Sequence, residues 1–216
     1  MIKLFVFLGL SMIALAPSPA IAQTAGMTRH FFECLKTRQP QDVRTLLSTS
    51  DAEIARHAYE HLAKSSRCFN ESVGDRQYAP DELSFSMDVM RGTLAEQALI
   101  ADEAKVEALQ PLPLQQKRYL RPWFAATGRN AAVDEMGACM ADTNSAGIMY
   151  LIRTPPGSTQ ESAAIGSLAP SIGKCLSAGT RLDADPTGLR SALADALYQR
   201  VSNPSLSTPN ISEQHR

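Results

Sequence analysis

The chain has 216 residues, 44% of them hydrophobic, and its 21 Lys and Arg nearly balance its 22 Asp and Glu, for a formal net charge of −1. A near-neutral protein has no global electrostatic field that would draw in nucleic acid or an anionic membrane surface, so we expect no nucleic-acid partner. The length suffices for one good hydrophobic core or two small ones.

The first 22 residues are typical of a secretory signal peptide. Lys3 supplies a positive start, residues 4–16 form an apolar run, and the segment up to Ala22 ends in the small-x-small pattern that signal peptidase accepts. The run is shorter than the roughly 20 residues that span a bilayer, and no second such run follows. We therefore expect cleavage near Ala22, a mature chain without a stable membrane anchor, and a periplasmic or secreted location.

Residues 23–101 have the pattern of a helical repeat. Apolar spacing predicts an opening helix over 28–37, and Pro40 begins a short helix at the position where proline is tolerated. Ser50 and Glu53 have the spacing of a capping box, which predicts the start of a third helix. A fourth helix is expected from about Ser86.

The third helix is predicted to be amphipathic. Its buried side is expected to consist of Ile54, Ala55, Ala58, Tyr59, Leu62 and Ala63. The opposite side carries His57 and His61, and His57-Ala-Tyr-Glu60-His61 matches the H-x-x-E-H string of one class of zinc metalloproteases. Because both histidines lie on the solvated side, we interpret them as surface residues, with weak metal binding as the alternative, and we expect no resident cofactor.

Residues 102–132 form a connector, in which Pro111-Leu-Pro113 ends any continuing helix. No acidic residue occurs from 108 to 133. Basic and aromatic residues alternate there instead, namely Lys117, Arg118, Tyr119, Arg121, Trp123 and Phe124. Such a mixture marks either an interaction patch or an aromatic connector that packs between the two repeats, and we favour the connector.

Residues 133–201 form the second predicted repeat. Helices are expected over 133–142, 146–153 and 158–175, the last of them interrupted at Gly166 and Pro170, and Asp185-Pro186 predicts the start of a fourth. The polar, proline-containing segment 202–216 is expected to be a disordered tail.

The four cysteines fall into two pairs of similar spacing. Cys34 and Cys68 lie 34 positions apart, and Cys139 and Cys175 lie 36 apart. An exported chain with an even number of cysteines usually forms disulfides, and four cysteines allow three pairings that sequence alone does not separate. If each repeat is a closed unit, the pairs are Cys34–Cys68 and Cys139–Cys175. A zinc site is the alternative, but its usual C-x-x-C spacing is missing.

The stretch Leu83–Leu99 aligns without gaps with Leu182–Tyr198, and Arg91 and Arg190 occupy the same position in the two copies. Each arginine falls within the apolar arc of its helix, where an unpaired charge is very costly. It is therefore either part of an anion-binding clamp or a structural anchor to carbonyls or a carboxylate, and the occurrence in both copies favours the anchor.

Three segments, 33–47, 153–176 and 182–198, resemble a group of small exported proteins of Alphaproteobacteria. The shared features are a cysteine followed by an LL-x-T segment, an S-x-x-E cap, a second cysteine and an LR-x-x-LA-[ED]-x-L stretch. The first copy departs from the last pattern at Gly92 and Gln97. The group has no known activity, so the resemblance implies an envelope location and no catalytic residue.

These patterns predict an all-α fold, in which two pseudo-repeats of about four short helices each pack into one compact body closed by disulfides. No nucleophile elbow or phosphate-binding loop is present in the sequence. We expect a non-catalytic periplasmic or secreted scaffold that binds a protein or a small ligand in the envelope. The alternative is a cell-envelope enzyme whose site follows no recognised motif.

Overall fold

The computed structural model describes residues 19–73, 85–114, 119–177, 179–180, 182 and 185–203, with side chains from residue 28 onward. Over these ranges the regular elements are all helices, and no strand occurs. The predicted all-α class is therefore confirmed. The region 1–18 of the predicted signal peptide and residues 204–216 of the predicted tail lie outside the described residues, and both predictions stand as they were.

The first half of the chain contributes six helices to the described part. They are α1 (Pro19–Arg38), α2 (Pro40–Ser48), α3 (Ala52–Ala63), α4 (Ser66–Val73), α5 (Met87–Ala101) and α6 (Glu103–Glu107).

The remaining elements belong to the connector and the second half. They are the 3₁₀ helix η2 (Pro122–Ala126) and the α-helices α7 (Ala131–Thr143), α8 (Ser145–Ile152), α9 (Thr159–Cys175) and α10 (Pro186–Ser202).

Most helix starts follow the sequence signals, with one correction. Pro40 is the first residue of α2, and Asp185 caps α10 by accepting from the amides of Thr187 and Gly188. The cap of α3 is Asp51 rather than the predicted Ser50, since one carboxylate oxygen of Asp51 accepts from the successive amides of Glu53 and Ile54.

Two further expectations about helices are wrong. Cys68 does not end the capped helix α3 but lies on a separate helix, α4. The helix α9 runs without interruption through Gly166 and Pro170, because both residues are exposed, so that water can reach the carbonyl that proline leaves without a donor. Ile54 also departs from its predicted burial, since 49% of its surface is exposed.

Two disulfides close the two halves separately. Cys34 is bonded to Cys68, with the Cα atoms 5.5 Å apart, and Cys139 is bonded to Cys175, with the Cα atoms 5.6 Å apart. This is the predicted pairing. In the chain-entropy model, a loop of this length stabilises the fold by about 3 to 4 kcal/mol per bridge.

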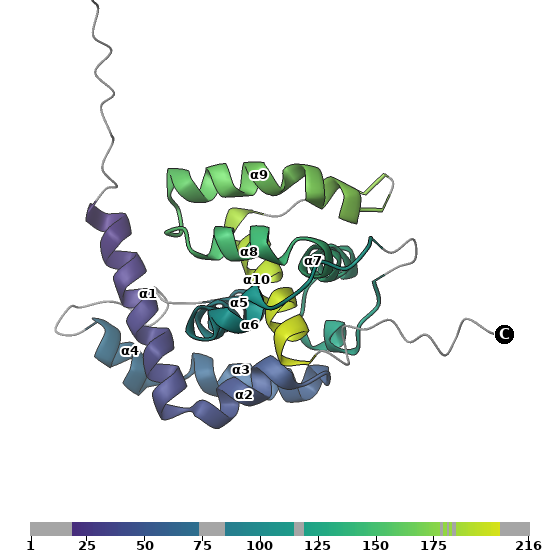
Figure 1. Ribbon diagram of the computed structural model, residues 1–216. Helices are drawn as coiled ribbons and strands as arrows, with labels where there is room; N and C mark the ends of the chain where they lie inside the picture. The colour runs from purple at the N-terminus through teal and green to yellow at the C-terminus, as the bar shows by residue number, and fades with distance from the viewer. Residues whose placement is uncertain are drawn as a thin grey trace, which may run out of the picture.

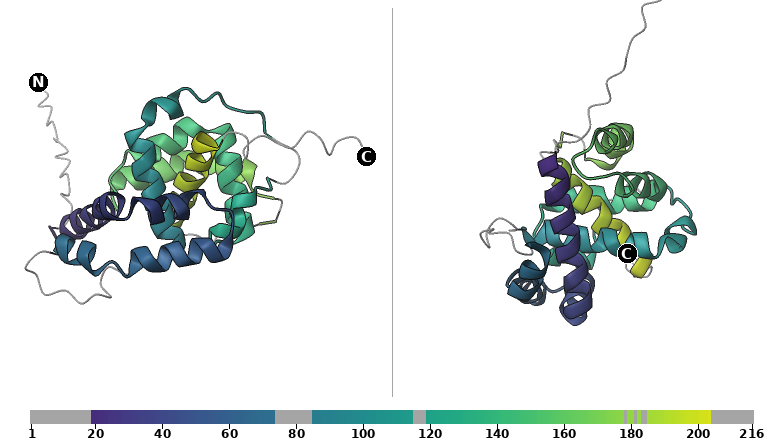
Figure 2. Two further views of the ribbon diagram at one scale, coloured as in Figure 1. Left: turned by 90° about the horizontal axis from the view of Figure 1, so that it is seen from below. Right: turned by 90° about the vertical axis from the view of Figure 1, so that its left-hand side faces the viewer.

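Helices α5 and α10 cross in the middle of the molecule. In Figure 1, α2 and α3 lie below this pair, and α8 and α9 lie above it. The views in Figure 2 show the same central position of α10, which packs mainly on α5 and α7. The two helices pack tightly at Gly92, where an added Cβ would fall 2.4 Å from the Cα of Ser191.

The hydrophobic interior consists of two main clusters that meet along α5 and α10. The first is built on α1 to α5, and its largest buried side chains include Phe32, Leu35, Leu46, Leu62 and Leu94. The second is built mainly on α7 to α10, with Met136, Met140, Ile148, Leu151 and Leu193 among its buried members. Tyr198 packs against both clusters. The predicted division into two repeats, a connector and a tail stays a prediction.

None of the described helices is long and apolar enough to cross a membrane.

The close contact at Gly92 gives a first prediction. Gly92→Ala should destabilise the fold by about 1 to 3 kcal/mol or more, because the new methyl group meets backbone atoms that cannot turn away. The matched control is Gly166→Ala on α9, where an added Cβ meets nothing within 4 Å. This substitution should stabilise the helix by about 0.5 to 1 kcal/mol, because alanine has the higher helix propensity. Chemical denaturation of the two variants measures the difference, and equal effects of the two would contradict the packing described.

Candidate functional site

Charged side chains converge inside the molecule around α5 and α10. Five of these side chains are arginines, of which three lie on α5 and α10 and two on the connector: Arg91, Arg190, Arg200, Arg121 and Arg129. The other five are carboxylates, namely Glu96, Asp134, Asp142, Glu161 and Asp195. We call this set the buried charge network. Its members pair with one another and with backbone carbonyls, as buried charges must.

Arg91 joins α5 to α2 and α10, and none of its surface is exposed. Its Nε donates to Asp195 Oδ2 at 2.7 Å, while its two terminal nitrogens donate to the carbonyls of Leu46 and Leu47. These carbonyls lie in the last turn of α2, where no intrahelical amide is available to them. Arg91 therefore satisfies the end of one helix and the carboxylate of another at once.

Arg190 makes the corresponding contacts from α10. Its Nε and Nη2 donate to the two oxygens of Glu96 at 2.7 and 2.6 Å, a bidentate geometry that is stronger than a single contact. Its terminal nitrogens also donate to the carbonyls of Leu151 and Ile152, at the end of α8. Glu161 of α9 accepts from Arg190 Nη1 at 3.0 Å.

The two sets of contacts are reciprocal. Arg190 lies 99 positions after Arg91, and Asp195 lies 99 positions after Glu96. Each arginine thus binds the carboxylate that follows the other arginine by five residues. These contacts are of the kind that the structural-anchor interpretation of Arg91 and Arg190 predicts.

Asp195 is shared between two arginines. Besides Arg91, it accepts from Arg129 Nη2, and Arg129 Nε donates to Asp134 at 2.9 Å. Burial raises the pKa of Asp195, but the positive charges of Arg91 and Arg129 outweigh this effect and hold the pKa below its ordinary value. The pKa of Asp134 is raised, because there burial outweighs the effect of Arg129.

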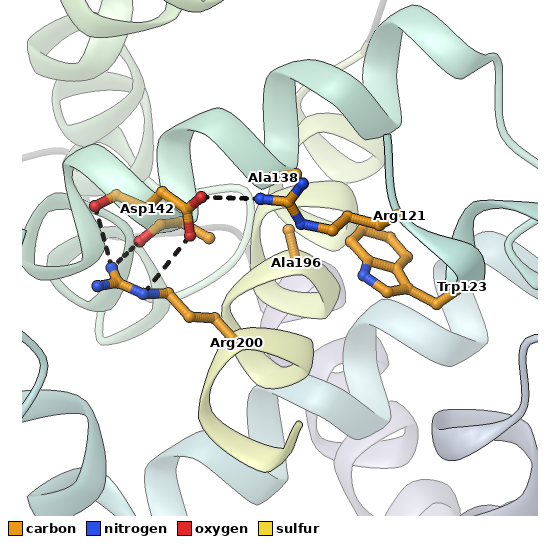
Figure 3. A pocket seen from close by; sticks show the side chains of 7 residues that line it. Arg121, Trp123, Ala138, Asp142, Ala196 and Arg200 are labelled. Carbon is orange, nitrogen blue, oxygen red and sulfur yellow. Dashed lines mark hydrogen bonds and ion pairs between the residues drawn. The ribbon is translucent and has the colours of Figure 1, made fainter. Parts of the chain in front are cut away.

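A second group of charges lies around Asp142, at the end of α7. Figure 3 shows Arg121 and Arg200 on either side of its carboxylate, with Arg121 Nη2 donating to Oδ2 at 3.1 Å and Arg200 Nε 3.6 Å from Oδ1. Arg200 also donates to the carbonyls of Ala141 and Asp142. Burial raises the pKa of Asp142 despite these arginines. The shallow depression between these side chains and Trp123 has no space for a water molecule.

The connector is fixed to the body at two points near Asp142. The amide of Leu112 donates to the carbonyl of Asp142 at 2.7 Å, and Arg121 binds its carboxylate. Residues 112–121, which we call the connector loop, therefore begin and end at Asp142.

The described residues of the predicted interaction patch are mostly buried. Tyr119 and Trp123 are 5% and 2% exposed, and the Arg121 side chain is 6% exposed. Trp123 and Phe124 stack edge to face at 4.6 Å and pack on the second cluster, while η2 also contacts α3. Tyr119, Arg121 and Trp123 thus pack inside the protein, as a connector between the halves would require, and both interpretations stay predictions. Lys117 and Arg118 lie outside the described residues.

Apolar side chains of the connector do face solvent. Leu114 is 49% exposed and Leu120 is 64% exposed. Leu114 follows one fixed point of the loop by two residues, and Leu120 directly precedes the other. Both therefore extend from the base of the same loop.

His57 and His61 lie on the solvent-facing side of α3. The His61 side chain is 71% exposed, with its Nδ1 3.9 Å from an oxygen of Asp42. Among the residues that the structure describes, no group of three or more metal-ligating side chains occurs.

Comparison with known proteins gives no relative, since no family model, curated protein or solved structure matches the chain. The resemblance to small exported proteins therefore stays a prediction.

The carboxylates that the arginines bind were not predicted from the sequence. Glu96 and Asp195 occupy the same position in the two aligned stretches, Leu94-Ala95-Glu96 and Leu193-Ala194-Asp195. In both copies an acidic residue follows the arginine by five positions, which could have indicated a charged partner. The reason for this spacing becomes clear only from the reciprocal packing of α5 and α10.

Removal of the Asp195 charge gives a second prediction. Asp195→Asn should destabilise the fold by about 3 to 5 kcal/mol, because it leaves Arg91 and Arg129 buried without their shared anion. Asp102→Asn is the control, since Asp102 pairs with Lys105 at the surface, where the two side chains are 48% and 65% exposed. Its effect should stay below about 1 kcal/mol. Urea denaturation at pH 7 checks both values, and a similar small loss in the two variants would contradict the account.

The pH dependence of the same variant gives a third prediction. The folded pKa of Asp195 lies below the ordinary value of 3.8, so its stabilisation is complete above that value and is lost as the pH falls through the folded pKa. The gap in unfolding free energy between wild type and Asp195→Asn should stay constant from pH 7 to about pH 5 and shrink below pH 3.8. Urea titrations over this range test the sign, and a gap that widens in acid would refute it.

Proposed function

We propose that this protein is a non-catalytic helical scaffold of the periplasm or the extracellular space, which binds another protein through its connector. The observation that carries this proposal is the exposure of Leu114 and Leu120 at the base of a loop that is fixed to the body. Large apolar side chains held outward on a rigid base are typical of protein-binding surfaces.

The fixed base is what makes these leucines suitable for recognition. Because Leu112 and Arg121 both bind Asp142, little conformational entropy at the base of the loop would be lost on binding, and preorganisation of this kind improves affinity. An outward-facing pair of leucines also suits a protein partner better than a small ligand, which usually needs a concave site.

The buried charge network supports a structural role for the charged residues. The guanidinium groups of Arg91 and Arg190 are bonded to helix ends and to carboxylates. Residues placed in this way stabilise the scaffold that presents the connector.

The proposed location follows from the cysteines and the N-terminal segment. Two disulfides are compatible with an exported protein, since disulfides persist in oxidising compartments. We propose that residues 1–22 are the signal peptide and that cleavage occurs near Ala22. Membership of the exported alphaproteobacterial group would agree with this location.

An envelope enzyme is the alternative function. Asp142 is the observation in its favour, because a carboxyl with a raised pKa beside two arginines could act as a general acid or base. The geometry supports this alternative less well, since Arg121 and Arg200 occupy both carboxylate oxygens.

A cross-linking experiment in the native host tests the proposed surface and gives a fourth prediction. A photo-reactive phenylalanine analogue placed at Leu120 should give a discrete cross-linked product, which disappears when Leu114→Glu is added. The matched control is the same analogue at Ile54, which is also exposed, at 49%, but lies on α3.

Leu114→Glu should leave the melting temperature unchanged, because this side chain is exposed. Loss of the product with an unchanged melting temperature supports a binding surface. Identical products from positions 54 and 120, or none from position 120, would contradict the proposal.

A further inference from the structure

The contact between α5 and α10 has the properties of an interface between two copies of one surface. Arg91 binds Asp195, and Arg190 binds Glu96. The two arginines lie 99 positions apart in the sequence, and so do the two carboxylates. A tight contact joins Gly92 and Ser191, which are also 99 positions apart. In an isologous interface, residue i of one partner contacts residue j of the other, and j contacts i in return.

The helices α5 and α10 belong to different halves of the chain, which we define as the parts before and after the end of α6, and each half has its own disulfide. One disulfide lies within residues 34–68 and the other within residues 139–175, so no bridge connects the halves. The two main hydrophobic clusters follow the same division, except for a few residues of α5, α6 and the connector. The halves could therefore part along α5 and α10 without breaking a covalent cross-link.

We propose that the α5–α10 contact is a self-complementary recognition surface whose partner is a second copy of this chain, with two chains exchanging halves to form a dimer. The hinge is the segment 108–109, between the end of α6 and Gln110, whose carbonyl accepts from Arg200 of α10. Every contact between the halves is restored in the exchanged dimer, because the same two faces meet.

The single chain is favoured under ordinary conditions for an entropic reason. A linker of a few residues gives the attached half an effective concentration of the order of millimolar. Exchange becomes dominant when the contact within one chain is impaired and the contact between two chains is not.

The pair Gly92 and Ser191 allows this impairment to be designed. Gly92→Ser places a Cβ 2.4 Å from the Cα of Ser191 in its own chain. A chain with Ser191→Gly offers a second half with a smaller residue at that point. When the first half of the Gly92→Ser chain packs on the second half of the Ser191→Gly chain, serine lies on α5 and glycine lies on α10. This is the native glycine–serine pair with the two helices interchanged, which a self-complementary interface accepts.

The experiment uses the two full mature chains, unfolded together with their disulfides intact and refolded at high protein concentration. Native mass spectrometry should detect a one-to-one dimer of Gly92→Ser with Ser191→Gly, at least tenfold more abundant than in a matched mixture of Gly92→Ser with wild type. One chain that carries both substitutions should refold as a monomer and recover most of the melting temperature lost in Gly92→Ser.

Each outcome decides the question. The mixed dimer, together with recovery in the doubly substituted chain, supports the proposal. A mixture without this dimer overturns the exchange of halves. Failure of the doubly substituted chain to recover overturns the equivalence of the two faces on which the exchange depends.

Discussion

The charge of Asp195 is the constraint on which the arrangement of the other elements depends. This carboxylate has no exposed surface, and it accepts from Arg91 of α5 and from Arg129 of the connector. Transfer of an unpaired carboxylate into a protein interior is prohibitively costly, so α10 can occupy the centre only when both arginines reach it. Arg91 in turn fixes the end of α2, and Arg129 fixes the start of α7 through Asp134. One buried anion thus sets the positions of three helices and the connector.

The same solution recurs at other helix ends. The last carbonyls of a helix have no intrahelical donor, and burial would leave them unsatisfied. Arg190 donates to the end of α8 and Arg200 to the end of α7, both from α10. A guanidinium suits this task because its five donors reach carbonyls and a carboxylate together. In return, the negative end of the helix dipole favours the cation. The central helices therefore act as a rigid frame for the shorter helices around them and for the connector that carries the proposed binding surface.

The sequence predicted most helix starts, and the assumption of two closed repeats predicted the disulfide pairs. Pro40 and Asp185 marked helix starts because their effects are confined to one turn, and the even spacing of the cysteines favoured the observed pairing. Contacts between distant segments could not be deduced in this way. The position of Arg91 on an apolar arc indicated burial, but its partner lies 104 residues away in the sequence. The exposure of Ile54 was also not predicted, because burial on α3 depends on its packing against α2, η2 and α5.

Reciprocal ion pairs hold the two halves together, and a double-mutant cycle on Arg190 and Glu96 measures this interaction. The cycle compares Arg190→Met, Glu96→Leu and the double variant with wild type by urea denaturation at pH 7. For a buried bidentate pair, the account predicts a coupling free energy of about 1.5 to 3 kcal/mol that changes little between low and high salt, because buried pairs are weakly screened. Additive effects of the two substitutions, or a coupling abolished by salt, would contradict it.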